Sequence, residues 1–296
     1  MYDIIIVGAG PAGLTAALYA GRANKKVLVL EGKTYGGQII NSMRIDNYPG
    51  IPNVSGFDFA TNLYQQVKDV GVEIHMEAVL KIDEDLKVYT AQHEYQGKTI
   101  ILATGVESRK LGLEKEDFLL GKGISYCATC DGAFFKGKNV AVYGGGNTAL
   151  EDAIYLSHLA NKVFLILRRD QFRGEERLVQ EVKNKNNIEI VYQSMITELF
   201  GNDTLEGIEI ESNHQKRKID IEGLFVAIGK VPNNEMFSNV VSLTPEGYIA
   251  SSDGIHTSHP KIYVAGDTRD KELRQLTTAV ADGAMAATKA IKEWED

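Results

Sequence analysis

The N-terminal region reads DIIIVGAGPAG over residues 3–13. The β-branched, apolar run from Asp3 to Val7 predicts a short buried strand, because it is too short to be a helix. It leads into a Gly8-x-Gly10-x-x-Gly13 loop, after which residues 14–24 carry apolar side chains at helical spacing. A second apolar run at 27–30 ends at Glu31. This order predicts a strand–helix–strand unit that binds a dinucleotide.

The glycines have separate tasks in such a loop. The first allows a tight turn, the second lets a pyrophosphate approach the backbone, and the third lets helix and strand pack closely. The predicted loop ligands are Gly8, Gly10, Pro11, Ala12 and Gly13. Glu31 is expected to bind ribose hydroxyls and to repel a 2′-phosphate, so the site suits FAD or NAD rather than NADP. The alternative is a tight turn without a ligand.

The same signature recurs in the middle of the chain. An apolar run at 139–143 precedes GGGNTA at 144–149, and a helical pattern and another apolar run follow. Where the first unit has Glu31, this unit has arginines. Arginine binds phosphate in a bidentate manner and stays charged, so this unit predicts an NADPH site, with a basic surface turn as the alternative. Its predicted ligands are Gly144, Gly145, Gly146, Asn147, Thr148, Arg168, Arg169 and Arg173.

Two dinucleotide sites in one chain imply hydride transfer from NADPH to a flavin. Further strands are predicted at 99–103, 223–228 and 261–265. Strands that alternate with helices predict an α/β fold with parallel, doubly wound sheets.

The chain has two cysteines, Cys127 and Cys130, separated by two residues and followed by Asp131. They are too few for a disulfide framework or a zinc site, so no metal is expected and a redox-active dithiol is predicted, with chance neighbours as the alternative. One thiol of such a pair attacks a substrate disulfide and the other resolves the mixed disulfide. Asp131 is placed to manage protons, or else serves as a turn or cap residue. Phe134 and Phe135 either dock a partner or belong to the core.

Composition restricts the class of protein. The chain has 296 residues, 44% of them hydrophobic and 24% charged, with a net charge of −8. An acidic chain argues against nucleic-acid binding. No apolar run reaches the roughly 20 residues that span a bilayer, and no basic region precedes the first apolar run as in a signal peptide. We therefore expect a soluble, cytoplasmic protein with neither nucleic acid nor membrane as partner.

Taken together, the motifs resemble those of the bacterial low-molecular-weight thioredoxin reductases over essentially the whole chain. The stretches that carry the resemblance are VGAGPAG (7–13), YGGQ (35–38), NYPG (47–50), LATG (102–105), CATCDG (127–132), GGGNTALE (144–151), LRRDQFR (167–173), AIGKVPN (227–233), VAGD (264–267) and Arg274-Gln275. CATCDG is the most specific of them. The sequence departs from the family pattern at Leu167, where the arginine motif usually begins with His, and this removes one polar group near the 2′-phosphate.

The resemblance implies two Rossmann-like three-layer domains. The FAD-binding domain would comprise residues 1–112 and 241–296, with an NADPH-binding domain carrying the CATC motif, residues 113–240, inserted between them. It further implies FAD contacts from Gly36, Gly37, Gln38, Asn47, Ala103, Thr104, Gly105, Gly266, Asp267, Arg274, Gln275 and Leu276. Cys130 would face the flavin, Cys127 would attack the partner, and Asp131 would donate a proton.

The implied activity is reduction of oxidised thioredoxin by NADPH through FAD and the Cys127–Cys130 pair, in a homodimer. One alternative keeps the fold but takes electrons from ferredoxin or acts on a small-molecule dithiol or disulfide. Arg168, Arg169 and Arg173 argue against ferredoxin as the donor. Another alternative is a redox-sensing binding protein without turnover, which an intact CATCD beside complete FAD motifs disfavours.

Overall fold

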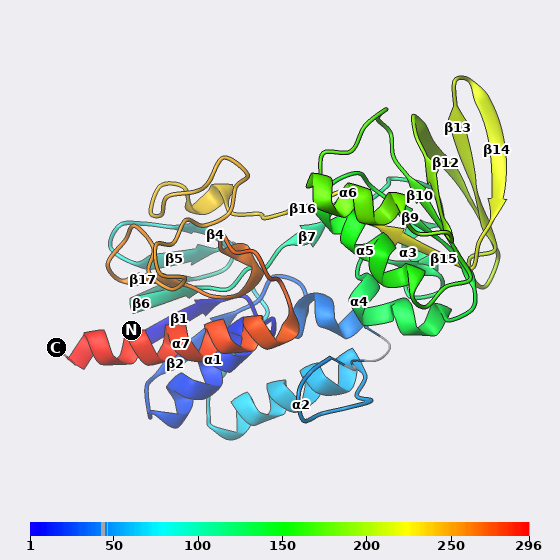
Figure 1. Cartoon of the computed structure of the whole chain (residues 1–296). Coiled ribbons are helices and arrows are strands. Elements are labelled where there is room, and N and C mark those ends of the chain that lie inside the picture. Colours follow the sequence, from blue (N-terminus) through cyan, green and yellow to red (C-terminus); the bar gives the residue numbers. More distant parts are fainter. Residues whose placement is uncertain (43–44, 46, 296) are drawn as a thin grey trace. The chain divides into compact units, whose positions relative to one another are not determined.

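The computed structural model describes residues 1–296 apart from 43, 44, 46 and 296. The chain forms two compact units (Figure 1). Unit 1 comprises Met1–Glu107 and Val231–Asp296, and unit 2 comprises Ser108–Lys230, which is inserted into unit 1. At the two crossings, β7 (Glu107–Ser108) and β16 (Lys230–Val231) pair as a two-stranded sheet.

The bounds of these units differ from the expected breaks near residues 113 and 241. The reason lies in two short apolar segments. Leu111 and Leu113 pack against the core of unit 2, whereas Phe237, Val240 and Val241 are buried in the core of unit 1. The chain therefore enters and leaves unit 2 earlier than the family resemblance implied.

Unit 1 is built on a seven-stranded sheet with the order β3-β2-β1-β6-β5-β4, in which β17 also pairs with β6. Its strands are β1 (Tyr2–Val7), β2 (Val27–Leu30), β3 (Glu73–His75), β4 (Val79–Ile82), β5 (Lys87–Thr90), β6 (Glu94–Leu102) and β17 (Ile262–Val264). The second half of β6 runs parallel to β1 and β17, while its first half pairs antiparallel with β5. The sheet is therefore parallel at its centre and antiparallel at one side.

The centre of this sheet is buried on both faces. In β1, Ile4 and Ile6 belong to one core cluster, and Ile5 and Val7 belong to the other. A strand covered on both faces needs apolar residues at every position, which explains the uninterrupted DIIIV run.

Helices cover one face of the sheet. They are α1 (Pro11–Arg22), α2 (Gly56–Asp69) and α7 (Leu276–Glu295). Three short helices complete the unit, η1 (Gly37–Asn41), η3 (Glu235–Phe237) and η4 (Gly266–Thr268), and Phe237 of η3 packs in the core on the opposite face of the sheet. Figure 1 shows α7, from the end of the chain, beside α1, from its beginning. Their approach is close, because a Cβ placed on Gly283 of α7 would lie 2.1 Å from the Ala12 carbonyl oxygen.

Unit 2 contains a five-stranded parallel sheet with the order β11-β10-β9-β15-β8 and an antiparallel sheet with the order β12-β13-β14. The strands are β8 (Ile124–Ser125), β9 (Asn139–Tyr143), β10 (Lys162–Ile166), β11 (Ile188–Val191), β12 (Ser194–Phe200), β13 (Gly207–Ser212), β14 (Gln215–Asp220) and β15 (Gly223–Val226). The helices are α3 (Glu116–Leu119), α4 (Ala128–Asp131), η2 (Gly132–Phe135), α5 (Asn147–Ser157) and α6 (Glu176–Lys183). The predicted fold class, α/β with Rossmann-like parallel sheets, is confirmed.

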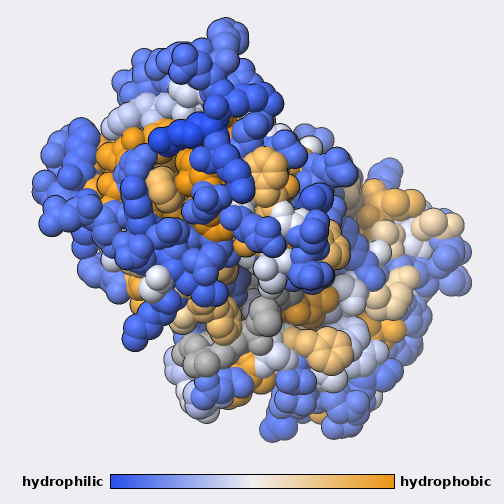
Figure 2. Space-filling model, turned by 90° about the vertical axis from the view of Figure 1, so that its right-hand side faces the viewer, coloured by the Kyte–Doolittle hydropathy of each residue, from blue (hydrophilic) through white to orange (hydrophobic). Residues whose placement is uncertain are grey.

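The three strands predicted outside the two motifs correspond to the second half of β6, to β15 and to β17. Figure 2 shows a face on which hydrophobic residues form separate areas among hydrophilic ones. Within the described part of the chain, no helix has the length and apolar character needed to cross a membrane.

Candidate functional site

The first glycine loop lies between β1 and α1, and its glycines are required for different reasons. Gly8 has φ +108°, and a Cβ there would lie 2.4 Å from the Ala103 carbonyl oxygen. A Cβ on Gly13 would lie 1.9 Å from the Gly8 carbonyl oxygen. By contrast, no described atom lies within 4 Å of a Cβ placed on Gly10. The first and third glycines thus serve packing, whereas the second leaves open space at the N-terminus of α1, where helix N–H groups favour an anion.

Glu31 lies at the end of β2 and contacts this loop. Its carboxylate accepts hydrogen bonds from the backbone N–H of Ala9 at 2.7 Å and of Lys33 at 2.8 Å. The negative charge is therefore fixed beside the glycine loop, in the position expected for a ribose-binding carboxylate.

A second loop, predicted from YGGQ, packs on the first. The backbone N–H of Gly36 donates to the Ala9 carbonyl at 2.7 Å, and a Cβ on Gly37 would lie 3.3 Å from the Gly10 Cα. Gly36 and Gly37 have φ values of +89° and +58°, which glycine adopts readily. The Gln38 side-chain amide donates to the Val106 carbonyl.

Residues predicted from distant motifs meet in unit 1. The Asn47 amide donates to the Gln275 side-chain oxygen at 3.1 Å. Ala103 directly follows β6, and its backbone N–H donates to the Val7 carbonyl at 2.8 Å. The Thr104 hydroxyl lies 2.8 Å from that of Thr268, and both hydroxyls bond the Asn234 side-chain oxygen. Asn234 is fully buried, and sequence reasoning missed it because no motif singles it out.

The VAGD segment and the start of α7 form one wall of the same region. Gly266 has φ +81°, and a Cβ there would lie 2.8 Å from the Ala12 Cβ. The Arg274 guanidinium donates to the Asp267 carbonyl at 3.3 Å and lies 4.2 Å from the centre of the Tyr248 ring. Leu276 begins α7.

The carboxylate of Asp267 can accept a further hydrogen bond. Its Oδ1 atom is buried and accepts no hydrogen bond within the described part of the chain, although the Lys271 ammonium lies 3.4 Å away. A buried acceptor of this kind normally has a donor. Together with the open space at Gly10, it fits a ligand that brings both a pyrophosphate and hydroxyl groups. Gly105, at the end of LATG, also has a positive φ, +66°.

The second glycine loop borders a cavity of about 400 Å³, and every residue that lines it belongs to unit 2. The lining residues are Arg109, Tyr143, Gly144, Gly145, Gly146, Asn147, Thr148, Leu167, Arg168, Arg169, Gln171, Arg173, Ala227, Ile228 and Gly229. All eight residues predicted for the second dinucleotide are among them. The pattern of the first loop is repeated, since a Cβ on Gly144 would lie 2.2 Å from the Ala227 carbonyl oxygen, while Gly146 faces open space among the described atoms.

The arginines of this cavity are available to an anion. Arg168, Arg169 and Arg173 are exposed, and no carboxylate of the described residues pairs with any of them. The segment that carries them is folded back onto the loop, because the Arg173 N–H donates to the Gly145 carbonyl at 2.7 Å and the Glu175 N–H donates to the Asn147 side chain at 2.8 Å. Burial raises the pKa of Tyr143 at the cavity wall, and the Arg168 charge opposes that rise.

Seven of the lining residues were not predicted as ligands, and the polar side chains among them are those of Arg109, Tyr143 and Gln171. Arg109 precedes the glycine loop by a long stretch of chain, and it reaches the cavity because its backbone N–H donates to the Gly229 carbonyl at 3.0 Å. Leu167 is 2% exposed and lines the cavity with carbon atoms where the family pattern has His.

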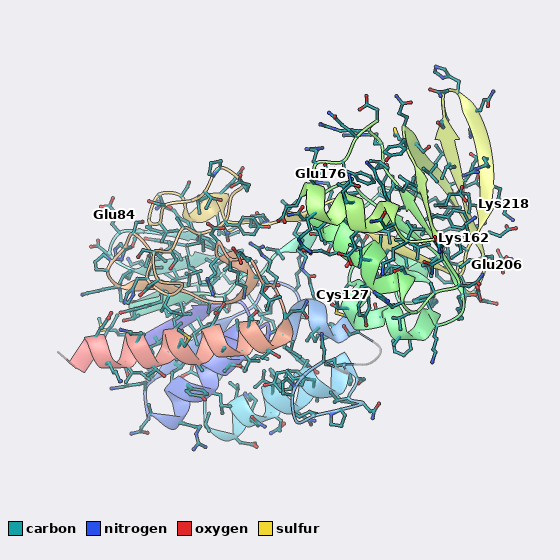
Figure 3. The ribbon with its side chains drawn as sticks, viewed as in Figure 1. Glu84, Cys127, Lys162, Glu176, Glu206 and Lys218 are labelled. Atoms are coloured by element: carbon teal, nitrogen blue, oxygen red, sulfur yellow. A yellow bond between two sulfur atoms is a disulfide. The ribbon has the colours of Figure 1, made fainter. Side chains whose placement is uncertain are left out.

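Cys127 and Cys130 form a disulfide with a Cα–Cα distance of 5.3 Å (Figure 3). The short helix α4 follows Cys127, and Ser125 anchors the turn by accepting a hydrogen bond from the Cys127 N–H at 3.0 Å. Just before it, the Tyr126 hydroxyl donates to Glu116 at 2.6 Å. Glu116 is a buried carboxylate that also accepts from the N–H groups of Leu111 and Gly112, so the segment leading to the dithiol is held at several points.

Asp131 lies one residue after the disulfide in conditions suited to carrying a proton. The Ser125 hydroxyl donates to one carboxylate oxygen at 2.6 Å, while the other oxygen is buried and has no hydrogen bond from the described residues. Burial raises the pKa of Asp131, against the opposing effect of the Ser125 hydrogen bond. A carboxyl group whose pKa is raised takes up and releases protons closer to neutral pH.

The two phenylalanines that follow the dithiol differ. Phe135 is buried and makes an edge-to-face contact with Phe225 at 5.3 Å, so it belongs to the core. Phe134 is 37% exposed.

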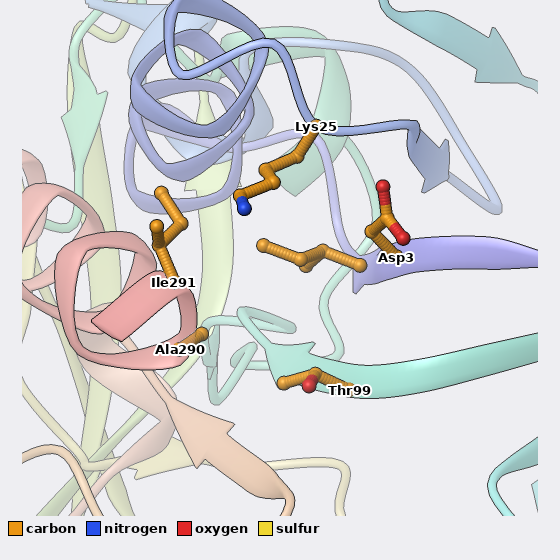
Figure 4. A pocket seen from close by; sticks show the side chains of 6 residues that line it. Asp3, Lys25, Thr99, Ala290 and Ile291 are labelled. Atoms are coloured by element: carbon orange, nitrogen blue, oxygen red, sulfur yellow. The ribbon is translucent and has the colours of Figure 1, made fainter. Parts of the chain in front are cut away.

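A small depression in unit 1 offers no comparable site. It lies among Asp3, Lys25, Thr99, Ala290 and Ile291 (Figure 4). The side chains around it leave essentially no room for a water molecule, so it is a packing gap.

Comparison with known proteins agrees with this geometry. A family model described as pyridine nucleotide-disulphide oxidoreductase matches residues 2–283. The chain is 39% identical to a thioredoxin reductase of Mycoplasma genitalium, covering 98% of this chain and 94% of that protein. It is 37% identical to a thioredoxin reductase of Listeria monocytogenes, covering 100% and 95%. The crystal structure of thioredoxin reductase from Streptococcus pyogenes matches with a TM-score of 0.93 and 39% identity, covering 100% of this chain and 98% of that one.

Proposed function

The chain belongs to the pyridine nucleotide-disulphide oxidoreductase family, and on this premise we propose that it is a thioredoxin reductase that acts through its Cys127–Cys130 pair. Proteins of this family use a flavin and a pyridine nucleotide. The observation that carries the proposal is the presence, in one chain, of two glycine-loop sites with opposite charges at the ribose position and a dithiol followed by an acid.

We further propose that unit 1 binds FAD and that unit 2 binds NADPH. For FAD, the support is the Glu31 carboxylate fixed beside the loop and two features of the described residues, namely that none lies within 4 Å of a Cβ placed on Gly10 and that none donates a hydrogen bond to Asp267 Oδ1. For NADPH, it is the cavity lined by Gly146, Arg168 and Arg169, because no carboxylate of the described residues pairs with these arginines and arginine binds a dianionic 2′-phosphate well. When bound, FAD supplies a carrier that accepts a hydride from NADPH and delivers two electrons to the disulfide.

The remaining chemistry belongs to the dithiol. Once reduced, Cys127 attacks one sulfur of the substrate disulfide, and the other substrate sulfur leaves as a thiolate and takes up a proton. Cys130 then attacks the Cys127 sulfur, which restores the Cys127–Cys130 bond and releases the second substrate thiol. Asp131, with its raised pKa, is the proposed holder of the proton. Ser125 keeps that carboxyl group beside the turn through its hydrogen bond.

The test is an anaerobic titration of the purified protein with NADPH and, separately, with NADH, followed by oxidised thioredoxin. We expect flavin bleaching at low NADPH concentration and recovery of the yellow colour when thioredoxin is added. Absence of bleaching by either nucleotide would move the electron source to another donor such as ferredoxin. Absence of tightly bound flavin would favour a redox-sensing protein without turnover.

The Cys130→Ser variant tests the order of electron flow. It should lose thioredoxin reduction while NADPH still bleaches its flavin, with Cys127→Ser as the matched variant. If bleaching also fails, the proposed order is wrong. A homodimer and a cytoplasmic location stay predictions, and light scattering on the purified protein measures the first.

A further inference from the structure

A buried lysine that no sequence motif singled out joins two segments of the proposed FAD site. Lys271 lies between η4 and α7, and its side chain is 5% exposed. Its ammonium lies 2.9 Å from Asp282 Oδ2, 3.2 Å from the Thr278 hydroxyl and 3.4 Å from Asp267 Oδ1. A buried ammonium needs such partners, because an unpaired charge in the interior is strongly destabilising.

The three partners of Lys271 lie on the two segments to which FAD contacts are assigned. Asp267 belongs to η4, and its Oδ1 atom accepts no hydrogen bond from the residues that the structure describes. Thr278 lies in the first turn of α7 and accepts a hydrogen bond from the Gln275 N–H at 3.1 Å. Asp282, one turn further along α7, accepts from the Gly266 N–H at 3.1 Å. Lys271 therefore fixes the carboxylate of Asp267 relative to the start of α7.

We infer that Lys271 is a positioning residue for FAD, which orients Asp267 so that its carboxylate can accept hydrogen bonds from hydroxyl groups of the cofactor. The inference rests on the proposed function, since it takes unit 1 as the FAD site. Lys271 acts through Asp267, which faces the ligand. Asp267 is the more exposed carboxylate of the two, with 27% of its side chain accessible against 7% for Asp282.

The structure supplies a matched control in Arg269. Its guanidinium also pairs with Asp282, through Nε at 3.0 Å and Nη2 at 3.1 Å, and no ion pair of the described residues joins it to Asp267. Lys271→Met and Arg269→Met each remove one cation from Asp282 and change the net charge equally. They differ in whether Asp267 loses its cation.

The experiment measures the dissociation constant of FAD on the FAD-depleted full-length protein by flavin fluorescence, with thermal unfolding of the same samples. Because Lys271→Met removes the ion pair that holds the Asp267 carboxylate in place, we expect it to raise the dissociation constant at least about tenfold. Arg269→Met should raise it less than about threefold. Lys271→Met should add little in an Asp267→Asn background, because both changes remove the same interaction.

Lys271→Arg keeps the positive charge, so its affinity for FAD should be close to that of the unsubstituted protein. This variant can still be measured if Lys271→Met does not fold. Equal losses of affinity in Lys271→Met and Arg269→Met, or full additivity with Asp267→Asn, would overturn the inference while leaving the FAD site intact. Failure of the unsubstituted protein to bind FAD would instead refute the proposed function, and the inference with it.

Discussion

The second glycine of each loop gives the sharpest test of the two proposed cofactor sites. Gly10 has φ −73° and ψ 179°, and Gly146 has φ −100° and ψ −176°. Alanine adopts both conformations without strain, and a Cβ at either position meets no described atom within 4 Å. Gly10→Ala and Gly146→Ala should therefore leave the free energy of unfolding within about 1 kcal/mol of the original, with stabilisation the expected sign.

Binding should respond differently from folding. A methyl group at the second glycine occupies the space through which a pyrophosphate approaches the backbone, and loss of one charge-assisted hydrogen bond costs about 1.5–3 kcal/mol. Gly10→Ala should weaken FAD binding about 10- to 150-fold and leave NADP⁺ binding unchanged, while Gly146→Ala should do the reverse.

Flavin fluorescence measures FAD binding, and titration calorimetry measures NADP⁺ binding. Gly13→Ala is the contrasting control, because its Cβ would lie 1.9 Å from the Gly8 carbonyl oxygen and should lower stability itself, by about 1–3 kcal/mol. Normal FAD affinity in a folded Gly10→Ala protein would refute the assignment of this loop to a pyrophosphate.

Three further predictions address charge and protons. Replacing Arg168 and Arg169 by alanine should raise the Michaelis constant for NADPH by about 10- to 100-fold and barely affect that for NADH. Equal effects on the two Michaelis constants would refute a contact between these arginines and the 2′-phosphate. Asp131→Asn should slow thioredoxin reduction about 10²-fold or more in single-turnover kinetics without changing the affinity for either cofactor, and an unchanged rate would assign Asp131 to the turn alone. His256 lies 2.6 Å from Asp253 and 3.0 Å from Glu293, and these carboxylates raise its pKa. The protonated His256 side chain stabilises the folded protein below the unfolded-state pKa near 6.5, and this stabilisation is lost as pH rises through the raised folded-state pKa. His256→Gln should therefore lower the melting temperature more at pH 6 than at pH 9. A change in melting temperature that does not depend on pH would contradict this.

The residues of the site that could be predicted from the sequence are those whose role depends on the local backbone conformation. Gly8, Gly13 and Gly144 closely approach neighbouring backbone atoms or side chains, and their spacing together with the predicted strand before and helix after each loop indicated the loops. Arg168 and Arg169 follow the end of β10 after one residue, Leu167, and the strand order places that end beside the glycine loop.

The residues that escaped prediction depend on contacts between distant segments. Arg109 lines the cavity only because the segment after β7 pairs with Gly229, and Lys271 acquires its role only when α7 brings Asp282 to it. The unit boundaries also depended on packing, since Phe237 follows the AIGKVPN motif but packs in the core of unit 1. Spacing in the sequence carries no information about such contacts.

The discontinuity of unit 1 has a consequence for synthesis on the ribosome. Unit 2 is a continuous segment, so its parallel sheet can close as soon as Lys230 has left the exit tunnel. The sheet of unit 1 instead waits for β17 to pair with β6 and for α7 to cover α1. Until then, the nascent chain exposes the apolar face of α1 and lacks Asp267, so the proposed flavin site is the last part of the protein to form during translation. The N-terminal segment made first is thus the one that depends longest on protection from aggregation.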